Sequence, residues 1–382
     1  MKATSLLPLF LSFGLLSLPA FAESPPNALA TAKAQLGQQL FFDTNLSKNR
    51  SQSCASCHSP AQGFADNRQG TELGGSIGDD GHSLGDRNAP SAGYASFSPK
   101  FHSKADGEWV GGQFWDGRAA TLAEQAGGPP LNPIEMGMPD KASVVERLKE
   151  NPEYQRQFDA LYGAGILDQP EQGYAAMADS LEAFEQTEFF APFDSKYDRF
   201  LRGEAKLTDQ EELGRLLFFS QQFTNCNQCH QLRKSARARD ESFSNYEYRN
   251  IGTPVNAELR AANGVAPDFV DRGLLDNPAV DDPAHAGKFK VPTLRNVAVT
   301  GPYMHNGVFK DLRTVVLFYD KYNNPTRTNN PETGEPWGKP EVADTLALKE
   351  LEHGPALEDE RVDAIVAFLK TLTDQRYEHL LK

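Results

Sequence analysis

The chain contains the five-residue pattern Cys-x-x-Cys-His twice, as CASCH at residues 54–58 and as CNQCH at residues 226–230. These two copies use all four cysteines of the 382-residue sequence. A histidine directly after a CxxC pair is typical of a site where two thiols bind haem c and the histidine ligates its iron. A thioredoxin-type site would use one CxxC pair, and a zinc site would not usually repeat the trailing histidine. We therefore predict two haem c groups, one attached covalently by Cys54 and Cys57 and the other by Cys226 and Cys229, with His58 and His230 as iron ligands.

The segment before each motif is also repeated. LGQQLFF occupies residues 36–42, and LGRLLFF occupies residues 213–219. Both segments place leucines four residues apart, as in short amphipathic helices. The sequence therefore predicts two related haem domains, which we place at residues 23–197 and 198–382.

Helical patterns and long loops dominate the rest of the chain. Thr208 followed by Glu211 forms a capping box, and the apolar residues of 362–369 recur at the spacing of a core-facing helix. Strand signals are weak, and stretches rich in Gly, Pro and Asp occupy residues 70–90 and 252–292. We predict a mainly α fold of two cytochrome c-like domains with long loops, with the haems near the domain interface.

The N-terminus has the pattern of a secretory signal peptide. Lys2 is followed by an apolar run over residues 6–18 and by the small-x-small sequence AFA at residues 20–22. The apolar run is too short for a membrane-spanning helix, and no later segment approaches about 20 apolar residues. We predict a signal peptide at residues 1–22, a mature chain that begins at Glu23, a periplasmic location and no membrane span. The alternative for residues 1–22 is a membrane anchor.

Two polar side chains between the motifs suggest proton chemistry. The pattern predicts a short helix that begins near Gly117 and ends at Gly127, with Gln125 on its last turn. Glu135 follows on a loop stiffened by prolines. A carboxylate near an open iron can carry the proton that moves when a peroxide O–O bond breaks, and an amide can orient the peroxide. By themselves, a loop glutamate and a glutamine are usually solvated.

Four further sequence runs carry a family resemblance. They are QFWDGRA at 113–119, LNPIEM at 131–136, VPTLRN at 291–296 and GPYMHNG at 301–307. Together with the two CxxCH motifs, they make nearly the whole mature chain resemble the bacterial dihaem cytochrome c peroxidase and MauG family.

The resemblance implies roles for residues around the first haem. The haem bound at residues 54–58 would be the peroxidatic one. Gln125, Pro129 and Glu135 match its distal pocket, with Glu135 as the acid–base group. Trp115 matches the residue that relays electrons between the haems.

The resemblance also implies a calcium ion. Asn88, Thr300 and Pro302 match the family's calcium ligands, which are one side-chain amide oxygen and two backbone carbonyls. Hard oxygen donors suit calcium, although three are few. Such an ion would tie the two domains together.

Two positions stay open within the family pattern. The distal ligand of the second haem is methionine in some members and tyrosine in MauG-like members. The matching position here is Tyr319, whose phenolate would lower the iron's potential, with Met304 as the alternative. Some members also carry a histidine just before the Asn88 position that caps the first haem. His82 lies there, but its spacing is about two residues short, and a histidine in a Gly/Asp loop is more often exposed.

The resemblance implies reduction of hydrogen peroxide with electrons from a small cytochrome c or cupredoxin. The net charge of −14 would favour a basic donor and argues against nucleic acid as a partner. The alternative is oxidation of side chains in a partner protein. MauG uses a surface tryptophan two residues before the second motif for that purpose, and this chain has Thr224 there. A pure electron carrier would need neither Gln125 nor Glu135. The chain is expected to be a monomer or a homodimer.

Overall fold

The computed structural model describes residues 25–381. The predicted signal peptide at residues 1–22 and the mature start at Glu23 lie outside the described residues. The fold is mainly helical, as predicted. The helices are α1 Pro25–Phe41, α2 Cys54–Cys57, α3 Leu122–Ala126, α4 Lys141–Lys149, α5 Pro152–Tyr162, α6 Pro170–Glu185, α7 Lys196–Leu201, α8 Asp209–Phe218, α9 Ala257–Asn263, α10 Leu312–Asp320, α11 Leu348–Leu351 and α12 Asp359–Lys370.

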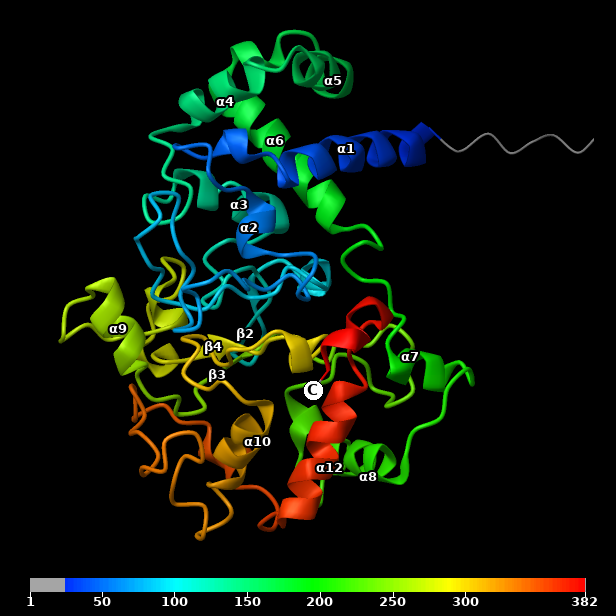
Figure 1. Ribbon diagram of the computed structural model, residues 1–382, viewed down its shortest axis with the longest axis vertical. Coiled ribbons are helices and arrows are strands. Elements are labelled where there is room, and N and C mark those ends of the chain that lie inside the picture. The colour runs from blue at the N-terminus through cyan, green and yellow to red at the C-terminus, as the bar shows by residue number, and fades with distance from the viewer. Residues whose placement is uncertain (1–24, 382) are drawn as a thin grey trace, which may run out of the picture.

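Two short antiparallel strand pairs connect the loops between the helices. The strands are β1 His102–Ser103, β2 Trp109–Val110, β3 Tyr248–Arg249 and β4 Phe289–Lys290, paired as β1–β2 and β3–β4. Val110 also forms an isolated bridge with Glu247, so backbone from both halves of the sequence meets in this layer. Figure 1 shows helices of the N-terminal half at the upper end, α8, α10 and α12 at the lower end, and loops between them. Within residues 25–381, no helix is long and apolar enough to cross a membrane.

The repeated leucine-glycine segments explain how each half packs. Gly37 of α1 lies so close to α6 that a Cβ atom there would fall 1.8 Å from the backbone oxygen of Ser180. Gly214 of α8 lies against α12 in the same way, with a Cβ position 1.8 Å from the backbone oxygen of Ala364. Only glycine permits such close approach of two helices. The same glycine in both repeats therefore sets the same helix crossing twice.

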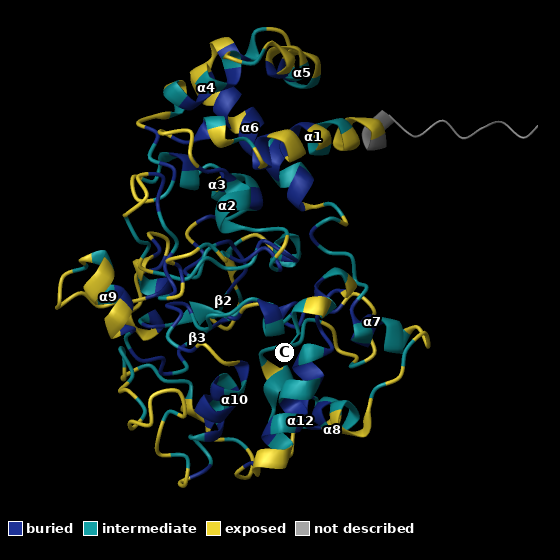
Figure 2. Cartoon of the chain, in the orientation of Figure 1, coloured by how far each residue is buried: buried dark blue, intermediate teal, exposed yellow. Residues whose placement is uncertain are grey.

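Each half has its own hydrophobic core. Buried residues from Leu36 to Phe190 form one cluster, and buried residues from Tyr197 to Leu372 form another. Figure 2 shows these buried segments around α1 and α6 at one end and around α10 and α12 at the other. The first cluster ends at Phe190 and the second begins at Tyr197. This transition lies close to the predicted domain boundary after residue 197, and the boundary stays a prediction.

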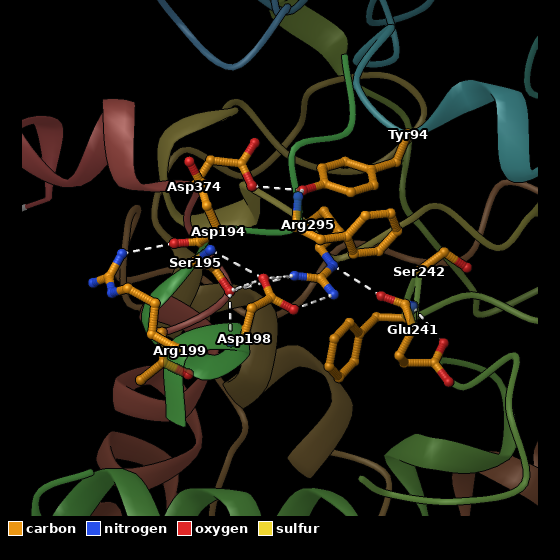
Figure 3. Close-up of polar contacts among 12 residues, drawn as sticks. Tyr94, Asp194, Ser195, Asp198, Arg199, Glu241, Ser242, Arg295 and Asp374 are labelled. Carbon is orange, nitrogen blue, oxygen red and sulfur yellow. Dashed lines mark hydrogen bonds and ion pairs between the residues drawn. The ribbon is translucent and has the colours of Figure 1, made fainter. Parts of the chain in front are cut away.

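A buried polar cluster joins the two halves (Figure 3). Arg295 has no exposed side-chain surface and pairs with Asp198 through N–O distances of 2.6 and 3.0 Å. Tyr94, from the N-terminal half, donates its hydroxyl to Asp374 at 2.6 Å. Asn296 donates to the same carboxylate at 2.8 Å. Because buried charges are stable only when paired, this cluster fixes how the halves meet.

The helix predictions were mostly confirmed. In α8, the Thr208 hydroxyl accepts from the amide of Glu211 at 3.2 Å, and the Glu211 carboxylate accepts from the amide of Thr208 at 2.7 Å, as in a capping box. The predicted start of the helix near Gly117 was wrong. α3 begins at Leu122, because residues before it form a bridge between Gln113 and Ala119.

Candidate functional site

Two cavities contain the two CxxCH motifs. The first has a volume of about 1630 Å³ and the second about 1620 Å³, including their solvent-facing parts. Cys54, Cys57 and His58 line the first cavity, and Cys226, Cys229 and His230 line the second. Each cavity therefore offers space for a macrocycle beside the residues predicted to attach it.

The two motif histidines have matching surroundings. His58 Nδ1 lies 3.4 Å from the backbone oxygen of Phe64, and His230 Nδ1 lies 3.3 Å from that of Phe243. Burial lowers the pKa of both imidazoles, that of His230 to about 4. A neutral imidazole whose Nδ1–H points at a carbonyl keeps Nε2 available for a metal. The residues present therefore fit the proximal ligand of a haem iron in both cavities.

The three predicted distal residues line the first cavity together. Gln125 lies near the end of α3, Pro129 follows in the next turn, and Glu135 lies on the loop beyond. The backbone oxygen of Glu135 accepts hydrogen bonds from Gln52 Nε2 at 2.5 Å and from the amide of Asp79 at 2.7 Å. These two bonds fix the loop that presents the Glu135 carboxyl group.

The Glu135 carboxyl group is held in a partly desolvated position. Asn132 Nδ2 donates to Glu135 Oε1 at 2.8 Å. Burial raises the pKa of Glu135, the charge of Arg118 and the Asn132 hydrogen bond oppose that rise, and Asp86 adds to it. A cavity carboxyl with a raised pKa is well placed to accept and return a proton near neutral pH.

Sequence reasoning missed three residues that shape this site. Gln52 and Asn132 position Glu135, and Arg118 acts on its charge. Arg118 is itself held by Asp116 at 2.9 Å and lies 3.6 Å from the ring centre of Phe114. Asn132 belongs to the LNPIEM run and Arg118 to the QFWDGRA run, so the family resemblance could have identified both as site residues. For Gln52, the sequence offers only its position two residues before Cys54.

Both candidate distal ligands line the second cavity. Tyr319 comes from α10, and Met304 comes from the preceding loop, where its φ is 71°. Burial raises the pKa of the Tyr319 hydroxyl. A ferric ion would favour the phenolate, because a nearby metal cation stabilises the anionic form of a ligand. Since both side chains reach the cavity that contains His230, the choice of Tyr319 stays a prediction.

Trp115 lies between the two cavities. Among the described residues, it is the one side chain that lines both of them. Its Nε1 donates to the backbone oxygen of Asn88 at 2.8 Å, and its own backbone oxygen accepts from the amide of Lys290 at 2.9 Å. Bonds to both halves of the chain therefore hold the indole in place.

The predicted calcium residues come together from distant parts of the chain. Asn88 Nδ2 lies 2.6 Å from the backbone oxygen of Pro302, and Thr300 lies two residues before Pro302. Rotation of the amide by 180° would bring two oxygens face to face, which a cation would stabilise. The assignment of calcium to Asn88, Thr300 and Pro302 stays a prediction.

His82 lies at the surface. Its side chain is 81% exposed, Nε2 is 3.4 Å from the Asp80 carboxylate, and it does not line the first cavity within the described residues. In this structure His82 is therefore an exposed loop residue rather than a group that faces the first cavity.

The fold and the two cavities define a dihaem c-type cytochrome with a carboxyl group in its first cavity. A family model described as di-haem cytochrome c peroxidase matches residues 31–206. The chain is 57% identical over 354 residues to the methylamine utilization protein MauG of Paracoccus denitrificans, with 92% of this chain and 91% of that protein covered. It is 33% identical over 291 residues to the cytochrome c peroxidase Ccp of Escherichia coli, with 76% and 53% covered.

A solved structure agrees with these sequence relationships. The diheme peroxidase BthA of Burkholderia thailandensis superposes with a TM-score of 0.80 and 33% identity, with 95% of this chain and 89% of that chain covered. The chain belongs to the dihaem cytochrome c peroxidase and MauG family, and it is an oxidoreductase of that family.

Proposed function

We propose that the protein is a periplasmic peroxide-dependent enzyme in which hydrogen peroxide binds in the first cavity. The observation that carries the proposal is the position of Glu135. Its carboxyl group lines the cavity that contains His58, and burial raises its pKa. An electron carrier needs no such proton donor and acceptor beside an iron.

The described residues around the proposed peroxide site have different roles in the reaction. A haem c in each cavity would supply the iron chemistry that cleaves the O–O bond and stores the oxidising equivalents. Asn132 donates a hydrogen bond to Oε1 of Glu135, whereas Oε2 of Glu135 has no hydrogen-bond partner among the described residues. Glu135 Oε2 is therefore the atom that accepts a proton from the near oxygen of peroxide and delivers it to the leaving oxygen. Gln125 orients the peroxide without changing its own charge.

The second cavity completes the proposal. Tyr319 and His230 would hold the iron of the second haem, and Trp115 would relay electrons between the cavities. Asn88, Thr300 and Pro302 would hold a calcium ion that ties together the domains at residues 23–197 and 198–382. What supports these assignments is that Trp115 lines both cavities and that Asn88 meets Pro302.

The electrons come from a small cytochrome c or cupredoxin, and peroxide becomes water. A steady-state assay with a reduced small cytochrome c as donor tests this function. We expect donor oxidation that depends on peroxide and stops in a Glu135→Gln variant. Absence of turnover with every small cytochrome c and cupredoxin tried would contradict the proposal.

A second candidate is oxidation of side chains in a partner protein. The observation that favours it is the 57% identity to MauG of Paracoccus denitrificans over 92% of this chain. Thr224 argues against use of the same exit point, because a threonine side chain cannot relay an electron as a tryptophan does. Peroxide consumption without donor turnover, but with covalent change in a co-expressed protein, would favour this candidate.

A further inference from the structure

The wall of the first cavity is built almost wholly by the N-terminal half. Its described lining residues lie between residues 52 and 185, apart from Phe269 and Asp276. Both residues follow α9 in the sequence, and α9 lies at one edge of the molecule (Figure 1). Because Phe269 belongs to residues 257–271, this segment of the C-terminal half reaches the cavity where we place the peroxide. We call it the α9 segment.

Two apolar side chains lie where this cavity meets solvent. Phe269 and Ile134 both line the cavity, yet they are 36% and 39% exposed. Each side chain therefore contributes both to the cavity wall and to the protein surface, which is the arrangement of a residue at a cavity opening. Large exposed apolar residues at a concave site often have a role in binding or access.

Phe269 is fixed by contacts on its own side of the opening. Arg260 Nη1 donates to the backbone oxygen of Phe269 at 2.9 Å, and its guanidinium lies 5.3 Å from the centre of the Phe269 ring. Arg260 also pairs with Glu341, whose carboxylate accepts from the amide of Asp271 at 2.7 Å. Arg260 therefore contacts Phe269 directly, and Glu341 holds both Arg260 and the backbone just after Phe269.

The α9 segment is anchored to the N-terminal half. Asp271 forms a two-point ion pair with Arg87, with N–O distances of 2.7 and 2.6 Å. Leu259 is 1% exposed and packs at Gly75, where a Cβ atom would lie 2.8 Å from its Cδ1. These anchors keep Phe269 at a set distance from the rest of the opening.

We propose that Phe269 and Ile134 form a rigid apolar rim that selects by size what reaches the first cavity. The rim admits hydrogen peroxide and other small ligands and excludes hydroperoxides that carry bulky organic groups. The choice of peroxide as oxidant rests on the proposed function, whereas the rim itself does not. Phe269 is thus a specificity-determining residue supplied by the domain that does not hold the first haem site.

The test that is independent of peroxide measures ligand binding to the oxidised holoprotein. Cyanide and 4-phenylimidazole would be mixed with wild type and with Phe269→Ala, and binding followed by haem absorption. We expect Phe269→Ala to speed 4-phenylimidazole binding at least about tenfold, because a smaller apolar group relaxes steric exclusion, and to leave cyanide binding nearly unchanged. Phe269→Trp should slow 4-phenylimidazole further.

Val270→Ala is the matched control. Val270 is the next residue, is apolar and 46% exposed, and does not line the first cavity. Its variant should behave like wild type with both ligands. Equal effects of Phe269→Ala and Val270→Ala, parallel changes for both ligands, or failure of every variant to bind either ligand would overturn the proposal.

A second arm connects the rim to the proposed reaction. Phe269→Ala should raise the rate constant for cumene hydroperoxide relative to that for hydrogen peroxide at least about tenfold. If the 4-phenylimidazole and cyanide experiment gives the expected result but no peroxide reacts with any variant, the proposed function is contradicted and the size-selecting rim is supported. If hydrogen peroxide reacts but the two rate constants keep their wild-type ratio, the result contradicts the size-selecting rim and supports the proposed peroxide-dependent function.

Discussion

Trp115 Nε1 donates a 2.8 Å hydrogen bond to the backbone oxygen of Asn88, and this bond holds an indole that lines both cavities. Asn88 is also bonded to the C-terminal half through Pro302. The side chain between the cavities is therefore positioned by the same residue that bridges the two halves. A change at either residue should alter communication between the haems without removing either haem.

Replacement of Trp115 by phenylalanine should separate the two haems electronically. A phenylalanine keeps an apolar ring but loses the bond to Asn88 and is far harder to oxidise. We expect both haems to remain bound and the peroxide-induced change at the second haem to slow by at least about tenfold, which corresponds to about 1.4 kcal/mol of barrier. Rapid-mixing absorption spectroscopy, including the near-infrared charge-resonance region, measures this.

Trp109→Phe is the control for that experiment. Trp109 is stacked on Phe101 at 4.7 Å between ring centres and does not line either cavity within the described residues. Its replacement should leave the kinetics as in wild type. Similar slowing in both variants would indicate a general structural effect and would remove Trp115 from the relay.

Glu135→Gln should slow the reaction with peroxide by about 10²- to 10⁴-fold, because the amide cannot accept a proton. The pH dependence has a defined sign. Burial raises the pKa of Glu135, so the carboxyl stays protonated to higher pH than an ordinary glutamate. Since the ionised form must accept the first proton, the wild-type rate should fall as pH decreases through this raised pKa. The variant should lose that dependence. Glu146→Gln, at a 69% exposed side chain, should change neither the rate nor its pH profile.

Tyr319→Phe should alter the absorption spectrum of the second haem and raise its reduction potential, because a phenolate ligand favours the oxidised iron. Met304→Leu is the matched variant, since Met304 lines the same cavity. If Met304→Leu changes the spectrum and Tyr319→Phe does not, methionine is the ligand. Spectroelectrochemistry of both holoproteins distinguishes these outcomes.

Glu185 should make folding stability depend on pH. It lies at the end of α6 in the wall of the first cavity, and burial, with a smaller contribution from Glu182, raises its pKa to about 8. An acid with a raised folded-state pKa stabilises the fold at low pH, and that contribution is lost as pH rises through the folded value. The free energy of unfolding should therefore decrease between about pH 4.5 and about pH 8, and Glu185→Gln should reduce this decrease. Glu188→Gln, at an exposed position, should retain it.

Arg295→Met should destabilise the protein strongly. The change leaves Asp198, whose side chain is 1% exposed, as an unpaired buried charge, which costs about 3–5 kcal/mol. Arg313→Met breaks more exposed pairs with Asp359 and Asp363 and should cost about 0–1 kcal/mol. Denaturant unfolding of the two holoproteins measures the difference. Equal losses of stability would contradict a special role for the Arg295 cluster.

The local parts of the fold could be predicted from the sequence, and the long-range parts could not. The capping box at Thr208 and Glu211 acts within one helical turn, so its sequence signal suffices. The start of α3 depends on the bridge between Gln113 and Ala119, which helix signals do not contain. The pair of Arg295 with Asp198 spans 97 residues, and no local pattern relates the two.

The same division holds for the candidate site. The CxxCH motifs predicted the two cysteines and the histidine that line each cavity, because each motif lies within five residues. The contacts that position Glu135 come from Gln52 and Asp79, which are close to it only after folding. The entry of Phe269 into the first cavity likewise depends on the packing of one half against the other.

The most direct test of the account is a titration of the oxidised holoprotein with hydrogen peroxide, followed by the absorption of both haems. One equivalent of peroxide should change the spectra of both haems together, because the first cavity receives the oxidant and Trp115 connects it to the second. An unchanged spectrum at both haems in excess peroxide would contradict the central claim.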